Sequence, residues 1–219
     1  MKIAGLSTTT GVSVATLKFY LRKGLLLPGK ATAINQAEYD DTHVRRVKLI
    51  RSLVDLGRLS IAEVGRVLGA VDDESLPVHD AFGLAQDAMV PDRERDDDMY
   101  SQALAEVDRF VRRHGMNIRP QAAVRSMLAD SLVSMAEFGC ADADRPVTSE
   151  FLDGLVPAIM ANAEVEIAMI PEPADRASQV EYTVVGTIAC EVATSALRRM
   201  ALEHASSQRF GTKPAKRRL

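Results

Sequence analysis

The chain has 219 residues, of which 47% are hydrophobic and 26% charged, a balance that excludes a disordered or fibrous protein. Its net charge of −3 combines a basic start, with 11 Lys and Arg against 5 acidic residues in positions 1–70, and an acidic remainder, with 16 against 25. This split indicates that the first part contacts phosphate and that the second part avoids it. The start lacks the apolar core of a secretion signal and no run could span a bilayer, so we expect a cytoplasmic protein with no membrane contact.

Turn and capping signals divide the first seventy residues into short helices. The turn Gly11-Val12-Ser13 places Ser13 as the N-cap of a helix that Gly24 ends. Apolar positions along that helix form one narrow stripe that faces the core, which consists of Val14, Leu17 and Leu21. Residues 25–39 show little periodicity and predict a strand-poor loop or a small hairpin wing.

Two more helices are expected before residue 70. The first begins near Asp40 or Asp41 and stops at Gly57, a natural C-terminal residue for a helix. Ser60 and Glu63 then match a capping box, in which each side chain satisfies a free backbone donor of the other residue. Such a cap contributes about 1 kcal/mol and opens a fourth helix.

The acidic, proline-containing segment 72–77 separates these helices from the rest of the chain. Beyond it we expect only helices, over residues 78–89, 93–113, 120–138, 149–170 and 176 to about 207. The last helix is apolar nearly all round between Tyr182 and Leu197, which predicts that it is buried. Small residues along one of its faces would let another helix approach closely: Gly186, Ala189, Ala193 and Ala196.

The segment from Gly11 to Tyr20, followed by Gly24-Leu25-Leu26, resembles the helix-turn-helix of MerR-like regulators. In that family a Gly-Val-Ser turn opens a recognition helix that ends in a basic-aromatic-aromatic triplet, here Lys18-Phe19-Tyr20. Residues 3–6 are similar to the family's first helix, and residues 39–68 to its remaining helix pair and second wing. The resemblance implies a homodimer on a pseudo-palindromic promoter site, which it distorts so that RNA polymerase can engage both promoter elements.

The resemblance and the periodicity together predict a mainly α protein in two parts. Residues 1–71 would form a winged helix-turn-helix DNA-binding domain, and residues 72–77 a linker. Residues 78–211 would form an all-α effector or dimerisation domain, followed by a basic tail over residues 212–219.

The physical case for DNA binding rests on the second helix. With its apolar stripe turned inward, the opposite arc displays Thr16 and Phe19 among cations, and an exposed ring there suits a thymine methyl in a major groove. The cations would hold phosphates and so supply affinity, not sequence choice. A solvated surface helix with a buried Phe19 is the structural alternative. The predicted DNA-binding residues are Ser13, Ala15, Thr16, Lys18, Phe19, Tyr20, Arg22, Lys23, Lys30, Gln36, Tyr39 and Arg58.

Two positions depart from the family pattern. Phe19 stands where the family often has a tyrosine, and Gln36-Ala37 stands where its wing usually carries Tyr-Arg before the tyrosine matched by Tyr39. The wing's phosphate contact therefore falls to Lys30 or Gln36, or is missing. Arg58 is a further phosphate candidate by its position in the second wing.

The sequence of the helical body is compatible with two roles. The terminal helix, together with residues 151–170, builds either the dimer interface or a cavity for a small organic effector. Metal or iron–sulfur sensing is not expected, and we predict no cofactor, because Cys140 and Cys190 lie far apart and the histidines lack ligand spacing (His43, His79, His114 and His204). Carboxylates within apolar helices would select a cationic ligand, form salt bridges or lie exposed: Glu164, Glu166, Glu181 and Glu191.

These patterns are compatible with three functions. The first is a one-component transcriptional regulator that couples a DNA-binding head to a helical sensor or dimerisation body. The second is a constitutive or architectural DNA binder without a small ligand. The third is an enzyme in the helical body, but that region holds no phosphate loop, metal-ligand motif or nucleophile elbow, so we predict that the protein is not an enzyme.

Overall fold

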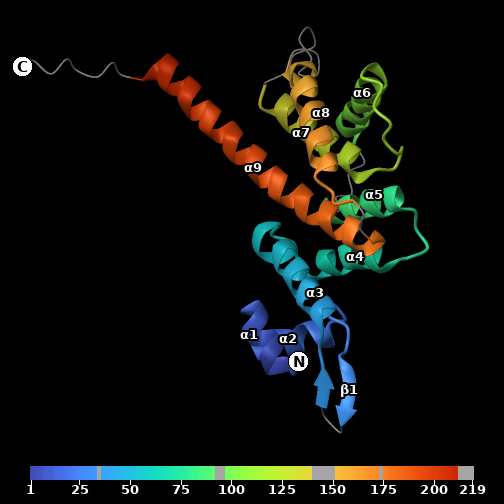
Figure 1. Cartoon of the computed structure of the whole chain (residues 1–219). Coiled ribbons are helices and arrows are strands. Elements are labelled where there is room, and N and C mark those ends of the chain that lie inside the picture. Colours follow the sequence, from blue (N-terminus) through green and yellow to red (C-terminus); the bar gives the residue numbers. More distant parts are fainter. Residues whose placement is uncertain (34–35, 92–96, 140–150, 173–174, 212–219) are drawn as a thin grey trace, which may run out of the picture.

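The computed structural model describes residues 1–33, 36–91, 97–139, 151–172 and 175–211, which are mainly helical (Figure 1). The elements in chain order are α1 (Ile3–Thr10), α2 (Val14–Arg22), β1 (Lys30–Ala33), β2 (Gln36–Glu38), α3 (Asp41–Arg51), the π-helical segment η1 (Ser52–Leu56), α4 (Ile61–Asp72), α5 (Val78–Met89), α6 (Asp98–Arg113), α7 (Ala123–Glu137), α8 (Asp153–Ala168) and α9 (Arg176–Phe210). The predicted spans match most closely at α5, and the starts expected at residues 93 and 149 lie outside the described residues.

Helices α1 and α2 form the expected helix-turn-helix. Gly11 adopts a left-handed conformation, with φ of 71°, that closes α1 and turns the chain into α2. The Ser13 hydroxyl then accepts a hydrogen bond of 3.1 Å from the Thr16 backbone, as its N-cap role predicts. Leu17 is fully buried, so the stripe predicted for α2 faces the core.

Strands β1 and β2 pair antiparallel and form the wing, one of the two structures that the sequence predicts for this region. Lys30 pairs with Glu38 across the strands, and the register shifts between Ala31 and Ala33. The Tyr39 backbone N–H, just after β2, donates a hydrogen bond of 2.7 Å to the Met1 carbonyl. The hairpin is therefore anchored to the start of α1.

Side-chain caps begin both helices of the next pair, at the predicted start near Asp40 and at the predicted Ser60 capping box. Asp40 caps α3, and hydrogen bonds from Thr42 and then from His43 hold the pKa of its carboxyl well below the usual range. Ser60 and Glu63 form the capping box of α4, with bonds of 2.7 and 3.3 Å. These caps fix where the two helices begin and so define the turn between them.

One apolar core joins the first seventy residues to two helices from the rest of the chain. Leu17, Ile50 and Val67 from the head are buried together with Ala85 of α5 and Val184 of α9. The segment 72–77 is thus a turn between elements of one core. The division of the chain into a DNA-binding domain and a helical domain remains a prediction.

Arg176, at the start of α9, fastens that helix to the end of α4. Its guanidinium donates to the backbone carbonyls of Leu76, Val71 and Asp73, at 3.0, 3.2 and 2.5 Å. The contacts with Val71 and Asp73 satisfy carbonyls that the end of α4 leaves without partners, and the contact with Leu76 lies in the turn before α5. They also fix the direction in which α9 leaves the head.

A second, smaller core lies between α6 and α7. Its buried members are Val107, Ala129 and Leu132. Asp87 of α5 connects it to the main core, because its carboxylate accepts from the Arg119 guanidinium at 2.7 Å and from the Ala123 backbone at 2.9 Å. The α6–α7 pair is therefore held on α5 by a partly buried polar contact.

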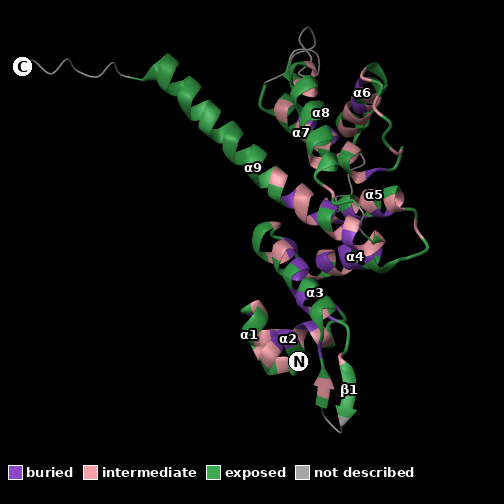
Figure 2. Cartoon of the chain, viewed as in Figure 1, coloured by how far each residue is buried: buried purple, intermediate pink, exposed green. Residues whose placement is uncertain are grey.

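The prediction that the last helix is buried between residues 182 and 197 holds in part as far as Ile188 and is wrong within the subunit for residues 189–197. Burial on α9 ends at Ile188, and every residue from 191 to 210 is exposed (Figure 2). The apolar pattern is real, but the described part of the subunit supplies no surface against that half of the helix. Figure 1 shows α9 projecting beyond the other helices.

Candidate DNA-binding surface

The outer face of α2 is open to solvent along most of its length. Ser13, Ala15, Lys18, Arg22 and Lys23 are exposed, as the DNA-binding prediction requires. Thr16 is partly exposed, and its hydroxyl lies 2.8 Å from the Ser13 hydroxyl. The face thus presents the hydrogen-bonded Thr16 hydroxyl together with the cations.

The aromatic pair of α2 differs from the sequence-based interpretation. Phe19, expected to be exposed, is partly buried against the main core, and Tyr20 is only 7% exposed. Burial, and then the nearby Asp55 carboxylate, raise the pKa of the Tyr20 hydroxyl. Tyr20 therefore supports α2 from behind, and Phe19 offers only part of its ring to a ligand.

The start of the chain adds a cation beside the wing that the sequence analysis missed. The Lys2 ammonium donates to the Thr32 hydroxyl and to the Gln36 side-chain carbonyl, both at 3.0 Å, and lies 4.0 Å from the Glu38 carboxylate. Lys2 is exposed and ties α1 to both strands. No local pattern could have revealed a contact that joins residues more than thirty positions apart.

A groove of about 650 Å³ runs between α2 and the wing. Lys2 and Lys18 line it together with Gln36 and Tyr39. Tyr39 is only 7% exposed, and its ring packs edge-on against His43 with centroids 5.1 Å apart. Lys30 is exposed at the start of β1. Of the predicted residues, the groove brings Lys18 of α2 together with Gln36 and Tyr39 of the wing region, and Tyr39 is a packed part of its floor.

Arg58 occupies the turn between η1 and α4. Among the described residues it alone is a non-glycine residue with positive φ, at 59°, a conformation that costs a residue with a Cβ about 1 kcal/mol. Its side chain is exposed. Gly57 beside it lies against the core, because a Cβ there would stand 2.8 Å from the Leu53 carbonyl and 3.1 Å from Ile188 of α9.

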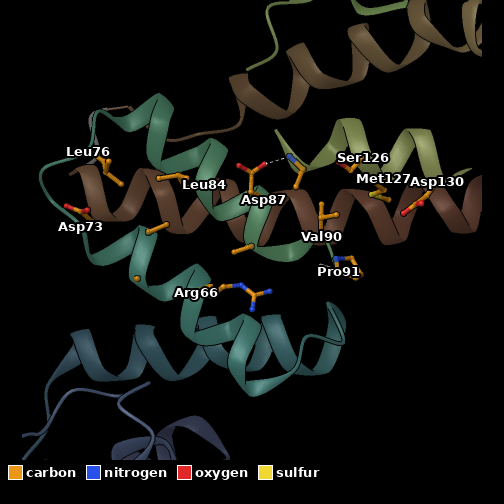
Figure 3. Close-up of a pocket in the computed structure, with 14 residues that line it drawn as sticks. Arg66, Asp73, Leu76, Leu84, Asp87, Val90, Pro91, Ser126, Met127 and Asp130 are labelled. Carbon is orange, nitrogen blue, oxygen red and sulfur yellow. Dashed lines mark hydrogen bonds between the residues drawn. The ribbon is translucent and has the colours of Figure 1, made fainter. Parts of the chain in front are cut away.

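Two cavities lie in the body, away from the α2 surface. Figure 3 shows the larger, of about 550 Å³, between α4, α5 and α7, with Arg66, Leu84 and Met127 in its lining. Its Asp87 carboxylate is already engaged, as the dashed line to the α7 backbone shows. The smaller, of about 340 Å³, lies between α8 and α9.

The four glutamates that the sequence analysis considers for a cationic ligand differ in exposure and in their partners. Glu164 is exposed, and Glu166 accepts from the Asn162 amide. Desolvation raises the pKa of Glu181, against the opposing effect of Arg45 and Arg46. Desolvation and then Glu166 raise the pKa of the exposed Glu191. The described residues contain no cluster of three metal-ligating side chains, and none of their helices could cross a membrane; Cys140 lies outside them.

This arrangement, a helix-turn-helix followed by a hairpin wing and a cationic outer face, defines a winged helix-turn-helix DNA-binding protein. Residues 1–70 match the family model described as "MerR HTH family regulatory protein". Residues 1–70 therefore form a MerR-family helix-turn-helix domain, which confirms the resemblance there, and the helical structure confirms the mainly α fold class.

Two proteins illustrate the similarity. The HTH-type transcriptional regulator ZntR homolog of Haemophilus influenzae is 32% identical over 68 residues, which cover 31% of this chain and 50% of that protein. The match thus spans half the length of that relative. The crystal structure of SCO5550, a proposed transcriptional regulator from Streptomyces coelicolor A3(2), superposes with a TM-score of 0.74 at 30% identity, covering 98% of this chain and 100% of that one.

Proposed function

We propose that this regulator binds a pseudo-palindromic promoter site as a homodimer, with α2 in the major groove and the wings on the flanking phosphates. The observation that carries the proposal is the groove between α2 and the wing, which Lys18 and Lys2 line together, with Lys23 exposed at the end of α2. Cations so placed neutralise phosphates, and Thr16 stands where a base edge would pass.

Distortion of the promoter is the second part of the proposal. Two heads fixed in a rigid dimer impose their own spacing and angle on the two half-sites, so the bound DNA must bend or untwist to meet both. The three carbonyl contacts of Arg176 support rigidity, because they fix α9 to the head. RNA polymerase would respond to the altered DNA and so act as an indirect partner in the cytoplasm.

Control by a small organic effector is the third part. Ile188 of α9 touches Gly57, next to Arg58, so a shift of α9 would move a phosphate-contacting residue. The body also contains cavities within the size range of small-ligand sites. A ligand that binds only the folded protein would raise its unfolding midpoint, whereas a constitutive DNA binder would show no such shift with any compound tested.

The test compares two variants on the DNA upstream of the protein's own gene. Thr16→Ala should change which sequences are preferred, because it removes a group that reaches bases. Arg22→Ala should weaken binding to all sequences alike, because it removes a phosphate contact. Footprints that are unchanged by both substitutions would refute the assignment of α2 as the reading helix.

A further inference from the structure

A third cavity lies where the head meets the start of α9. Its volume is about 240 Å³, and its lining comes from four segments: residues 26–28 after α2, residues 42–46 of α3, residues 71–72 of α4, and Ala177 and Glu181 of α9. None of the residues assigned to DNA binding lines this cavity. A molecule bound there would touch the head and the projecting helix at the same time.

One wall of the cavity carries an arginine with free hydrogen-bond donors. Arg46 is buried and forms an ion pair with Asp72, so these two lining charges are matched. The Arg45 guanidinium donates one hydrogen bond, of 3.1 Å, to the Ser178 hydroxyl. Because a guanidinium has five N–H groups, Arg45 keeps donors for an anionic group in the cavity.

The wall from α9 carries the opposite charge. Glu181 is half-buried, and its carboxylate forms no hydrogen bond or ion pair with the residues that the structure describes. Desolvation raises the pKa of this carboxyl, while the more distant charges of Arg45 and Arg46 oppose the rise. A carboxylate that has lost water without gaining a partner destabilises the fold, so Glu181 offers an acceptor to a cationic group.

The remaining wall is apolar. Leu26 and Val71 are buried behind it, whereas Leu27 is 62% exposed and Pro28 follows it in the lining. An exposed leucine beside a cavity gives apolar surface that a bound molecule removes from water. The lining therefore combines one available cation, one carboxylate without a partner and one apolar wall.

We propose that this cavity binds a small zwitterion, an α-amino acid with an apolar side chain. Its carboxylate accepts from Arg45, its ammonium group donates to Glu181, and its side chain packs against Leu27 and Pro28. A simple amine would bring a positive charge to Arg45 with nothing to neutralise it, and a simple carboxylic acid would do the same with a negative charge at Glu181. The volume lies below the roughly 300–1,000 Å³ of sites for drug-sized ligands, which suits a molecule of this size.

The bound amino acid would join α3 to α9, because Arg45 belongs to one helix and Glu181 to the other. It would thus reinforce the contacts of Arg176 and favour the conformation in which Ile188 lies against Gly57, next to Arg58. This inference deepens the effector control proposed above and rests on it for any effect on DNA. Binding of the ligand itself is measured without DNA.

The experiment titrates the full chain by calorimetry with leucine and with two analogues that each lack one charge. These are 3-methylbutylamine, without the carboxylate, and 4-methylpentanoate, without the amino group. Leucine should bind at least about 10-fold more tightly than either analogue, because each analogue leaves one charged side chain of the cavity unmatched. Leucine, valine and methionine should also raise the midpoint of thermal unfolding, since they bind only the folded protein.

Two substitutions test the roles of the charged walls separately. Glu181→Gln should weaken leucine binding about 10-fold or more and abolish the preference for leucine over 4-methylpentanoate. Arg45→Gln should abolish the preference for leucine over 3-methylbutylamine. Glu203→Gln, the same change on the exposed end of α9, is the matched control and should bind leucine as wild type does. Unfolding of each variant without ligand shows whether it is folded.

The outcomes separate the site from the function. Either analogue binding as tightly as leucine, no rise in midpoint with any of the amino acids at millimolar concentration, or equal losses in Glu181→Gln and Glu203→Gln would overturn the site. Such a result together with intact binding to the upstream DNA would leave the proposed DNA-binding function in place. Leucine that binds as expected and leaves DNA affinity unchanged would support the site and overturn the effector control.

Discussion

The head of this protein and the second half of α9 use the same amino acids in opposite ways. In the head, leucines and valines from α2, α3 and α4 meet in one core, and α9 joins that core through Val184 and Ile188. Past Ile188, the same helix presents leucine and methionine to solvent. An apolar stripe thus predicts that a helix will be covered, but not whether its own subunit supplies the cover.

Shortening one leucine in each region tests this difference most strongly. Leu17 is fully buried and Leu197 is 65% exposed. Leu17→Ala should lower the free energy of unfolding by about 2–5 kcal/mol through lost burial and a cavity. Leu197→Ala should cost less than about 0.5 kcal/mol in a monomer but more as dimers form. Denaturant unfolding at several protein concentrations measures both, and a large, concentration-independent loss in Leu197→Ala would contradict the comparison.

The junction between the regions is the next test. Arg176→Ala removes three hydrogen bonds from a charged donor to carbonyls at the end of α4 and should destabilise the protein by about 2 kcal/mol. It should also make hydrogen exchange faster along the first half of α9. Arg199→Ala, on the exposed half, is the matched control. Equal effects of the two substitutions would show that Arg176 does not fasten α9.

A smaller effect is expected at the cap of α4. Ser60→Ala should cost about 1 kcal/mol. Hydrogen bonds with Ser60 hold the pKa of Glu63 below its ordinary value, so this carboxylate stabilises the fold at neutral pH and ceases to do so as the pH falls through its lowered pKa. The difference between wild type and Ser60→Ala in thermal unfolding should therefore shrink in acid. A difference that grows in acid would exclude the capping box as its cause.

The smallest stability effect is expected at Arg58 and has the opposite sign. Arg58→Gly relieves a positive φ and should stabilise the fold by up to about 1 kcal/mol. It should also weaken DNA binding equally for all sequences, because the proposed phosphate contact of Arg58 would be lost. Paired thermal unfolding and binding assays separate the two effects. Lower stability together with unchanged DNA binding would refute both the strain and the phosphate contact assigned to Arg58.

What the sequence revealed depended on distance along the chain. Local signals were sufficient for the Ser13 and Ser60 caps, the bounds of α5 and the cations of α2, because capping and periodicity involve near neighbours. The burial of Tyr20 and the contact of Lys2 with the wing depend on elements far apart in sequence, so no local pattern carried them.

We propose that the exposed face of α2 and the wing together read DNA. The most direct measurement is a binding titration of the full chain against the dyad-containing DNA upstream of its own gene and against a scrambled fragment, over a range of salt concentrations. We predict tight binding to the upstream fragment, a steep loss of affinity as salt rises, and much weaker binding to the scrambled fragment at every salt concentration. Equal affinity for the two fragments at every salt concentration would show that this surface does not read a specific sequence.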